Sequence, residues 1–368
     1  MEIKFLNYAG EFKIVSIALD EETKADLLDD NIDFLYVTES KLSLFPDEIE
    51  LELNIEIEAV FTKLNNYDVY EIWPNGTFRR IYDVSSMDNY FYVTGKCNSN
   101  CVMCPSSDYS RKNANEADIH NLIEIAKHIP TDTKHLTITG GEPFMAGKEI
   151  FEFISFLRDK YEETEFLILT NGRIFAVEEY AKLLRESIPR RCIMAIPIHG
   201  SCASTHDAIT RSEGSFKQTI VGIKRLLALK IKVELRLVVC NLNLNDFDRL
   251  AELVIKELPT VEYISVMATE MTGNAFLNRN QVWVPYKKAF SSVERAIKRL
   301  IENGIDVKLY NFPLCTVKKE FWTLCEKSIS PDKVRYAEIC DTCLYKKACG
   351  GVFAGTFLLE KDELEAMA

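Results

Sequence analysis

Three cysteines in the sequence Cys97-Asn-Ser-Asn-Cys101-Val-Met-Cys104 have the type and the spacing to hold a metal centre. They follow an aromatic and β-branched run, Tyr90 to Thr94, which predicts a strand that ends just before them. Four thiolates would close a tetrahedral zinc site or complete a four-iron cluster. Three thiolates can hold three corners of a cubane and leave one iron open for a substrate. The spacing therefore indicates chemistry, with a structural zinc knuckle as the alternative.

A second motif, Gly140-Gly141-Glu142-Pro143, comes directly after the next predicted strand, His135–Thr139. Two glycines at the carboxyl end of a strand let the backbone approach a ligand closely. The carboxylate can accept hydrogen bonds from a ligand ammonium group. An ordinary Gly-Gly turn is the alternative, but the two motifs each end a strand and lie about one βα unit apart.

Together, the two motifs resemble the radical S-adenosylmethionine (SAM) superfamily. The resemblance implies that Cys97, Cys101 and Cys104 carry a 4Fe-4S cluster whose fourth iron binds the amino and carboxylate groups of SAM. It also implies that the Gly-Gly-Glu-Pro turn contacts the SAM amino group and that Met103 packs on the adenine. Reductive cleavage of SAM would then give a 5′-deoxyadenosyl radical that abstracts hydrogen from the substrate.

From Tyr90 onward the sequence alternates between strand and helix. The predicted strands are 90–94, 135–139, 165–170, 192–198, 232–239 and 262–267, and the helices between them are 115–129, 148–161, 177–186, 215–229 and 246–258. Parallel βαβ units of this kind predict an α/β fold. Six units suit a partial (β/α)6 TIM-like barrel, which the resemblance also implies. An open Rossmann-type sheet is the alternative, although no G-x-G-x-x-G follows the first strand.

Side chains at the carboxyl ends of the later strands are further candidates, because active sites of such folds lie there. The resemblance implies that they contact SAM, and purely structural roles are the alternative. These candidates are Asn171, His199, Ser201, Arg236 and Met267. The isolated thiols of Cys192, Cys202 and Cys240 are expected to be free and mostly buried.

The C-terminal cysteines predict a second centre. Cys340-x2-Cys343-x5-Cys349 is compact enough for one metal centre, and an upstream cysteine can supply the fourth thiolate. Cys315 follows a rigid Phe-Pro-Leu approach and is preferred over Cys325, which lies in the predicted helical stretch 317–327. The run is similar to the SPASM or twitch extensions of peptide-modifying radical SAM enzymes, which implies one auxiliary 4Fe-4S cluster. A structural zinc is the alternative.

Later segments look like the HxsC-type maturase of the His-Xaa-Ser peptide systems, namely 265–275, 310–315, 327–330 and the ending 340–353. The likeness covers about residues 85–357. It implies an enzyme that modifies a ribosomally made precursor peptide. Its further partners would be an electron donor, such as flavodoxin or ferredoxin, and a second radical SAM enzyme. A small-molecule or nucleoside substrate, a zinc-binding interaction protein and a catalytically silent peptide-binding partner are the alternatives.

Charge divides the chain. Residues 1–88 contain 20 Asp/Glu, 7 Lys/Arg and no cysteine. Strands are expected at 11–19, 33–38, 49–58, 67–72 and 78–82, and a helix at 22–29. The sequence thus predicts an acidic β-rich domain (1–88), the barrel (89–305) and a small cysteine-rich extension (306–368). The first domain is expected to bind the precursor peptide by strand addition, or to serve as a lid or dimer contact.

Composition excludes several classes of function. Such an acidic face argues against a nucleic-acid partner, because phosphate contacts need Lys and Arg. No apolar run approaches the roughly 18–20 residues that span a membrane, and the start Met-Glu-Ile-Lys-Phe is no secretory signal. Eleven cysteines without export indicate metal or redox work in a reducing compartment. We therefore predict a cytoplasmic protein.

Overall fold

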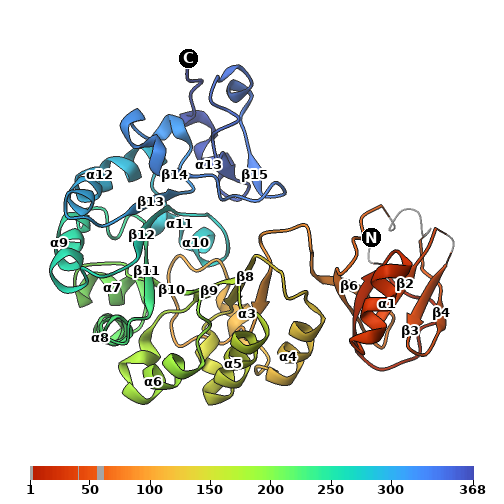
Figure 1. The fold of residues 1–368 in the computed structure, drawn as a ribbon. Coiled ribbons are helices and arrows are strands. Elements are labelled where there is room, and N and C mark those ends of the chain that lie inside the picture. Colours follow the sequence, from red (N-terminus) through yellow and green to blue (C-terminus); the bar gives the residue numbers. More distant parts are fainter. Residues whose placement is uncertain (1–2, 40, 56–61) are drawn as a thin grey trace.

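The computed structural model describes residues 3–39, 41–55 and 62–368 (Figure 1). Its centre is an eight-stranded sheet in which all neighbouring strands are parallel. In spatial order the strands are β14 (Cys325–Glu326), β13 (Val307–Tyr310), β12 (Tyr263–Ala268), β11 (Lys232–Val239), β10 (Cys192–Pro197), β9 (Glu165–Leu169), β8 (His135–Thr139) and β7 (Tyr90–Tyr92). The predicted α/β fold with six parallel strands is confirmed, and β13 and β14 extend the sheet.

Helices pack on the outer face of this sheet, and Figure 1 shows them in an arc around it. The sheet buries alternate side chains against them, such as Val233, Leu235 and Leu237 of β11. Glu234 and Arg236 therefore point to the inner face. The connecting helices are α4 (Ile119–His128), α5 (Ile150–Lys160), α6 (Glu178–Ser187), α8 (Ser215–Ala228), α9 (Phe247–Glu257) and α12 (Tyr286–Glu302).

Loops at the carboxyl ends of the strands contain further short helices, which the sequence did not predict. They are α3 (Asp108–Lys112), α7 (Ala203–Thr210), α10 (Gly273–Leu277) and α11 (Arg279–Val282), with 3-10 turns η1 (Pro143–Glu149) and η2 (Arg173–Ala176). All of these elements lie at one end of the sheet, so they form the surroundings of the cysteine loop.

The N-terminal part is a six-stranded mixed sheet. In spatial order its strands are β4 (Ile49–Leu51), β3 (Leu42–Phe45), β2 (Phe34–Val37), β1 (Lys13–Ala18), β5 (Val69–Ile72) and β6 (Phe78–Tyr82), and α1 (Glu21–Asp29) links β1 to the parallel β2. The sequence missed β3. The predicted strand 49–58 forms β4 over its first residues only, and positions 56–58 lie outside the described residues.

The first described residues lie across both outer strands of this sheet. The Phe5 amide donates to the Gly76 carbonyl (2.8 Å) beside β6, and the Leu6 amide donates to the Glu52 carbonyl (2.7 Å) beside β4. The sequence predicts that a peptide adds as a strand to an edge of this domain, without saying which edge. The chain itself supplies that pairing here.

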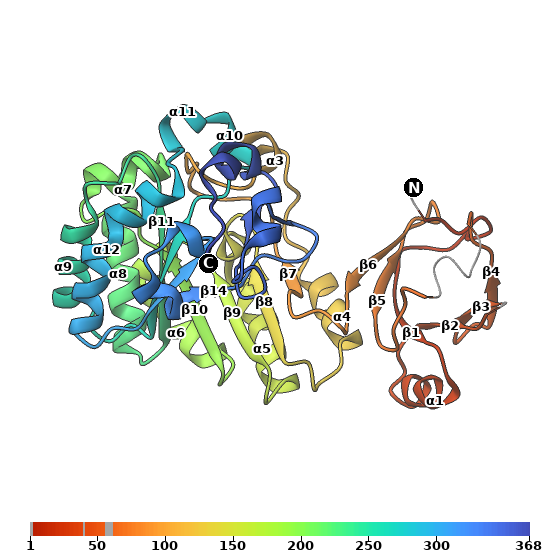
Figure 2. The ribbon, with the colours of Figure 1, turned by 90° about the horizontal axis from the view of Figure 1, so that it is seen from above.

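The N-terminal sheet packs against the side of the barrel at α4, as Figure 2 shows. The Ser16 hydroxyl lies 3.1 Å from Nδ1 of His128, and the Tyr82 hydroxyl lies 2.8 Å from that of Thr133. Ile14 and Tyr82 belong to the same apolar core as the barrel. His128 ends α4 and Thr133 precedes β8, so these contacts lie near the amino ends of the strands, away from the cysteine loop.

The C-terminal segment forms irregular structure over the far edge of the sheet. It contains η3 (Leu314–Thr316), η4 (Lys319–Leu324), β15 (Val334–Arg335), η5 (Glu338–Thr342), β16 (Val352–Phe353), α13 (Phe357–Glu360) and η6 (Lys361–Glu363). The helix predicted over 317–327 is wrong, because η4 is a 3-10 turn and Cys325 begins β14. Among the described residues, no helix combines the length and apolarity needed to cross a membrane.

Candidate functional site

Cys97, Cys101 and Cys104 lie in the loop that follows β7, at the carboxyl end of the sheet. Burial, and after it the neighbouring thiols of Cys104 and Cys97, raises the pKa of Cys101 to about 12. The three sulfurs are therefore close enough to influence one another. A bound metal would hold such thiols as thiolates, because metal ligation requires deprotonation.

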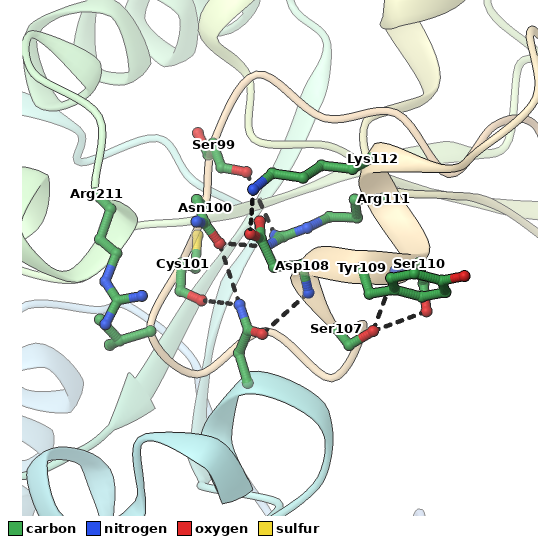
Figure 3. A network of polar contacts seen from close by, with 12 residues as sticks. Ser99, Asn100, Cys101, Ser107, Asp108, Tyr109, Ser110, Arg111, Lys112 and Arg211 are labelled. Atoms are coloured by element: carbon green, nitrogen blue, oxygen red, sulfur yellow. Dashed lines mark hydrogen bonds and ion pairs between the residues drawn. The ribbon is translucent and has the colours of Figure 1, made fainter.

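A polar network holds this loop in place (Figure 3). Arg111, only 8% exposed, donates to the Ser99 carbonyl (3.4 Å) and to the Asn100 side chain. The Asn274 amide donates to the Asn100 side chain (3.2 Å) and to the Cys101 carbonyl (3.1 Å). The cysteine loop thus depends on side chains from α3 and α10, neither of which the sequence identified as part of the site.

The segment that begins α10 also contacts the loop through its backbone. The Asn274 amide N–H donates to the Cys104 carbonyl (2.8 Å). Gly273 has φ +51°, and a side chain there would overlap the Pro105 carbonyl. Asn278 donates to the Val102 carbonyl (3.0 Å). The only signal for these residues in the sequence was the resemblance carried by 265–275.

The Gly-Gly-Glu-Pro turn packs directly on the strand that leads to the cysteines. The Gly141 amide donates to the Thr94 carbonyl (2.7 Å), and the Glu142 amide donates to the Lys96 carbonyl (2.8 Å). A Cβ at Gly140 or Gly141 would overlap the backbone of 94–96. These glycines therefore allow close approach of two chain segments, one of which ends at Cys97. Pro143 begins η1.

The Glu142 carboxylate points into the protein and is 2% exposed. It accepts hydrogen bonds from the Phe144 amide (3.2 Å), the Thr170 hydroxyl (2.7 Å) and the Asn171 amide (2.7 Å). Burial raises its pKa, and these hydrogen bonds oppose that shift. The sequence assigned this carboxylate to a ligand ammonium. In the structure it joins the ends of β8 and β9.

The remaining predicted contacts divide into those near the cysteine loop and those with internal partners. Asn171 donates from its side chain to that of Asn98 (2.6 Å), within the loop. The Ser201 amide and hydroxyl both donate to the Asp246 carboxylate (2.6 Å each). Asp246 thus fixes the turn after β10, and the Ser201 hydroxyl proton is already used.

His199 has a buried polar atom without a hydrogen-bond partner. It is 5% exposed, and its Nδ1 is the only buried side-chain nitrogen or oxygen, within the described chain, that lacks a hydrogen-bond partner. Burial, and then the neighbouring His206, lowers the pKa of His199 to about 3. The His199 amide donates to Nδ1 of His206 (3.1 Å). A neutral imidazole with a free nitrogen can still bind a polar ligand.

Arg236, Met267 and Met103 each have neighbours within the protein, and their contacts with SAM stay predictions. Arg236 points into the barrel, where its Nε donates to Glu234 (2.9 Å). Met267 is half-buried on the next strand, level with Val238. Met103 is 8% exposed and lies in an apolar cluster with Ile209 and Met271, among others. Contact of Met103 with adenine stays a prediction.

The four cysteines predicted for the second centre line one small cavity: Cys315, Cys340, Cys343 and Cys349. Backbone amides point at two of the sulfurs. Leu314 and Gly351 donate to Cys349 Sγ, and Met367 donates to Cys343 Sγ, each at 3.4 Å. Hydrogen bonds to cysteine sulfur are among the features that tune iron–sulfur clusters. The donor set therefore fits such a cluster.

Cys325 is not part of this cavity lining. Its thiol donates to the Phe321 carbonyl (3.8 Å) instead. Within residues 3–39, 41–55 and 62–368, no three His, Cys, Asp or Glu side chains converge closely enough for a single metal ion. All eleven cysteines are free thiols, and Cys192 and Cys240 are buried as expected.

Comparison with known proteins places this geometry in context. Residues 91–254 match the family model of the radical SAM superfamily. AdoMet-dependent heme synthases of Methanosarcina barkeri and Nitratidesulfovibrio vulgaris are each 28% identical, over 172 and 156 residues, respectively. These stretches cover 46% and 42% of this chain but only 47% and 41% of the relatives. The chain thus matches less than half the length of either relative.

Solved structures show the same fold at low identity. The crystal structure of Streptococcus suis SuiB superposes with a TM-score of 0.50 and 14% identity, covering 66% of this chain and 52% of SuiB. This likeness adds the fold. The cysteine loop and the Gly-Gly-Glu-Pro turn lie inside residues 91–254. The part of the chain that matches the radical SAM model therefore contains both motifs.

Proposed function

We propose that this chain is a radical SAM enzyme that modifies a ribosomally made peptide. The observation that carries the proposal is the pair of cysteine sites. One is a three-cysteine loop at the carboxyl end of β7, packed against Gly140 and Gly141. The other is a separate cavity lined by four cysteines in the C-terminal segment. The superfamily implies a 4Fe-4S cluster and SAM at the first site, and we assign an auxiliary 4Fe-4S cluster to the second.

A cluster on Cys97, Cys101 and Cys104 would supply the electron that cleaves SAM. The chain's own contribution is position. Arg111 and Asn274 fix the loop, and Glu142 fixes the neighbouring turn through three hydrogen bonds. The buried, neutral imidazole of His199 lies at the same end of the sheet, with its Nδ1 unpaired. We assign this nitrogen to SAM or substrate.

The finer assignment, an HxsC-type maturase, rests on the segments named above and on the acidic N-terminal sheet. That sheet would favour a basic or histidine-bearing precursor peptide. Its outer strands are partly covered by residues 3–7, but a groove of about 610 Å³ lies between β6, β7 and α4. We place the peptide there. Flavodoxin or ferredoxin as electron donor and a second radical SAM enzyme remain part of the proposal.

Anaerobic purification tests the enzyme class. We expect a brown protein with about eight irons per chain if both sites hold 4Fe-4S clusters. It should form 5′-deoxyadenosine from SAM and a reductant. Replacement of Cys97, Cys101 and Cys104 together by Ala should halve the iron and stop this cleavage. A colourless protein loaded with zinc would refute the proposal and favour a structural metal-binding protein.

The names of the curated relatives favour a second candidate, heme synthesis. This candidate and peptide modification share SAM cleavage, so 5′-deoxyadenosine does not separate them. Growth of a heme-auxotrophic strain that expresses this chain would favour heme synthesis. A mass change in a co-expressed precursor peptide, without rescue of that strain, would favour the maturase.

A further inference from the structure

We infer that the interior of the barrel binds a carboxylate of the substrate, and that Arg236 is the residue that recognises it. The inference rests on the proposed function and adds the chemistry of the substrate. It also gives Arg236 a different partner from the SAM carboxylate that the sequence suggested.

A cavity of about 860 Å³, open to solvent, lies against the inner face of the sheet. Residues from β7 to β13 line it, together with the segments just before these strands. Its charged residues are five Lys or Arg and three Asp or Glu: Arg190, Arg191, Lys232, Arg236, Lys308, Asp88, Glu165 and Glu262. The chain as a whole carries a net charge of −12. Three of these cations already have carboxylate partners, because Arg191 pairs with Glu165, Lys232 with Glu262 and Lys308 with Glu326. The case for an anionic guest therefore rests on Arg236.

The buried carboxylate of Glu234 holds the Arg236 side chain in place. Glu234 is 1% exposed and accepts hydrogen bonds from Arg236 Nε (2.9 Å), the Ser265 hydroxyl (2.5 Å) and the Tyr263 hydroxyl (3.2 Å). These contacts fix both the carboxylate and the direction of the guanidinium. A buried ion pair of this kind is costly unless its geometry is well satisfied. Glu234 meets that requirement with three donors.

The outer end of the same guanidinium faces the cavity. In the described part of the chain, neither terminal nitrogen of Arg236 has a hydrogen-bond partner, and its side chain is 24% exposed. Two parallel N–H groups on a planar guanidinium match the two oxygens of a carboxylate. A substrate carboxylate bound here would accept hydrogen bonds from both terminal nitrogens of Arg236.

A second cation lies in the same row of the sheet. The register places Arg236 beside Ser265 and Ser265 beside Lys308 on three adjacent strands. Lys308 Nζ lies 4.9 Å from the centre of the Tyr263 ring and 3.5 Å from the Glu326 carboxylate. It is partly exposed, so it can turn toward an anion bound at Arg236.

Arg236 lies inside the barrel, below the carboxyl ends of the strands where the cysteine loop lies. It pairs with Pro197, two residues before His199, and lies three residues before the end of β11 at Val239. The cysteine loop lies beyond that end of the sheet. An unmodified ribosomal peptide carries negative charge only as carboxylates, so either an acidic side chain or its C-terminus is the expected guest.

The test measures binding to the cluster-loaded full-length protein in the presence of SAM. The probes are three N-acetylated, unlabelled octapeptides whose binding is measured by isothermal titration calorimetry: an amide with central glutamates, its glutamine analogue, and the glutamine analogue with a free C-terminal carboxylate. We expect one carboxylate peptide to bind about tenfold or more tightly than the glutamine amide, as a charge-assisted hydrogen bond predicts. Which one does so identifies the source of the carboxylate.

Arg236→Gln should abolish this preference while the SAM affinity stays unchanged, and Arg236→Lys should restore part of it.

The exposed Arg185→Gln is the matched control. Because Arg236→Gln leaves Glu234 buried without its partner, the double variant Glu234→Gln/Arg236→Gln is measured beside it. Equal or undetectable binding of all three peptides, or a preference that survives in both Arg236→Gln variants, would overturn the inference. So would a loss of SAM affinity alone, which would return Arg236 to the cofactor. Absence of 5′-deoxyadenosine formation by the wild type would refute the proposed function itself.

Discussion

Glu142 shows how a single side chain connects two strand ends. Its three donors come from the turn after β8 and from the first residues after β9. The neighbouring backbone lies against the segment that leads to Cys97. At the residue scale, the carboxylate therefore acts on the site by fixing its shape.

This role predicts the behaviour of Glu142→Gln. The amide keeps the size of the carboxylate, but its NH₂ group must face a donor from Thr170, Asn171 or Phe144. We expect a loss of roughly 1–3 kcal/mol in unfolding free energy, accompanied by weaker SAM binding. Chemical denaturation and a SAM titration measure the two effects. Thr170→Val, which removes one donor, should lower stability less. Weaker SAM binding at unchanged stability would instead show a direct ligand contact.

The cysteines of the C-terminal segment give a second prediction at this scale. Cys315→Ala should lose the auxiliary cluster, about half of the iron if both sites hold 4Fe-4S clusters. Cys325→Ala should retain its iron, because Cys325 does not line the cavity and its thiol bonds to Phe321. Iron analysis with Mössbauer spectroscopy distinguishes the two variants. Iron loss in Cys325→Ala and retention in Cys315→Ala would reverse the assignment.

At the scale of elements, α10 and the residues before it link the cysteine loop to the C-terminal segment. Asn274 contacts the loop at Asn100, Cys101 and Cys104. A few residues earlier, the Met271 amide donates to the hydroxyl of Thr356, a fully buried residue of the C-terminal segment (3.0 Å). The segment 271–274 therefore touches both regions.

Asn274→Asp tests the first half of this link. The aspartate can still accept from the Asp108 amide but loses both donors to the cysteine loop and brings a charge near Asp108. We expect a shifted EPR signal and a lower reduction potential of the SAM-binding cluster, with the auxiliary cluster unaffected. Asn303→Ala, at the exposed end of α12, is the control. Unchanged spectra and potential in Asn274→Asp would show that the loop holds its own shape.

A buried carboxylate also joins α13 to α12. Both oxygens of Glu360 accept from the Tyr286 amide (3.2 Å each), and Glu360 is fully buried. Burial raises its pKa from 4.5 to about 7. The folded protein thus keeps a proton that the unfolded chain has released. This contribution to stability, roughly 3 kcal/mol, is present below about pH 4.5 and disappears as the pH rises through 7.

Glu360→Gln should remove that dependence. Relative to the wild type, the variant should gain stability as the pH rises from about 5 to 8, because it never ionises. Thermal melts of the loaded protein over this range measure the difference, and Glu302→Gln on the exposed face of α12 is the control. A constant difference between wild type and Glu360→Gln would show that Glu360 does not titrate in this range.

The spacing of apolar residues and the composition of the turns were enough to predict the longer strands and helices. The strands β8 and β11 begin and end at the predicted residues, because in each of them apolar residues alternate with polar ones. The short β13 and β14 were missed, since two to four residues show no period. Cys325 was placed in a helix because pairing with β13, which makes it a strand, depends on distant residues.

The site was predictable only where its residues are neighbours in the chain. The cysteine triplet, the glycine turn and the four-cysteine set were all identified from spacing. Asn274 was not, because its partner Asn100 lies 174 residues away. Likewise, no local pattern shows that Ser201 faces Asp246 or that Arg236 faces Glu234 and the barrel interior.

At the scale of the whole molecule, the N-terminal sheet and the barrel share a core. Ile14, Val69 and Tyr82 belong to the barrel's apolar cluster. Deletion of residues 1–84 should therefore lower the melting temperature, which the sequence alone did not suggest. The cysteine loop keeps its contacts, so 5′-deoxyadenosine formation per loaded protein should persist, while binding of the precursor peptide is lost. Full peptide affinity in the truncated protein would exclude the peptide-binding role, and failure to load clusters would favour a lid.

The contacts of segment 271–274 with the cysteine loop and with the C-terminal segment, which contains the second cysteine site, have a consequence for how the protein is assembled. If a cluster bound at one site orders this segment, a cluster that binds at the other site no longer has to pay the full loss of conformational entropy. Linkage makes such an effect reciprocal, so neither site can favour the other without being favoured in return. Under limiting iron, chains with both sites filled and chains with neither should then outnumber the half-filled ones. The hydrogen bond from the Met271 amide to the Thr356 hydroxyl would be the structural source of this all-or-none loading.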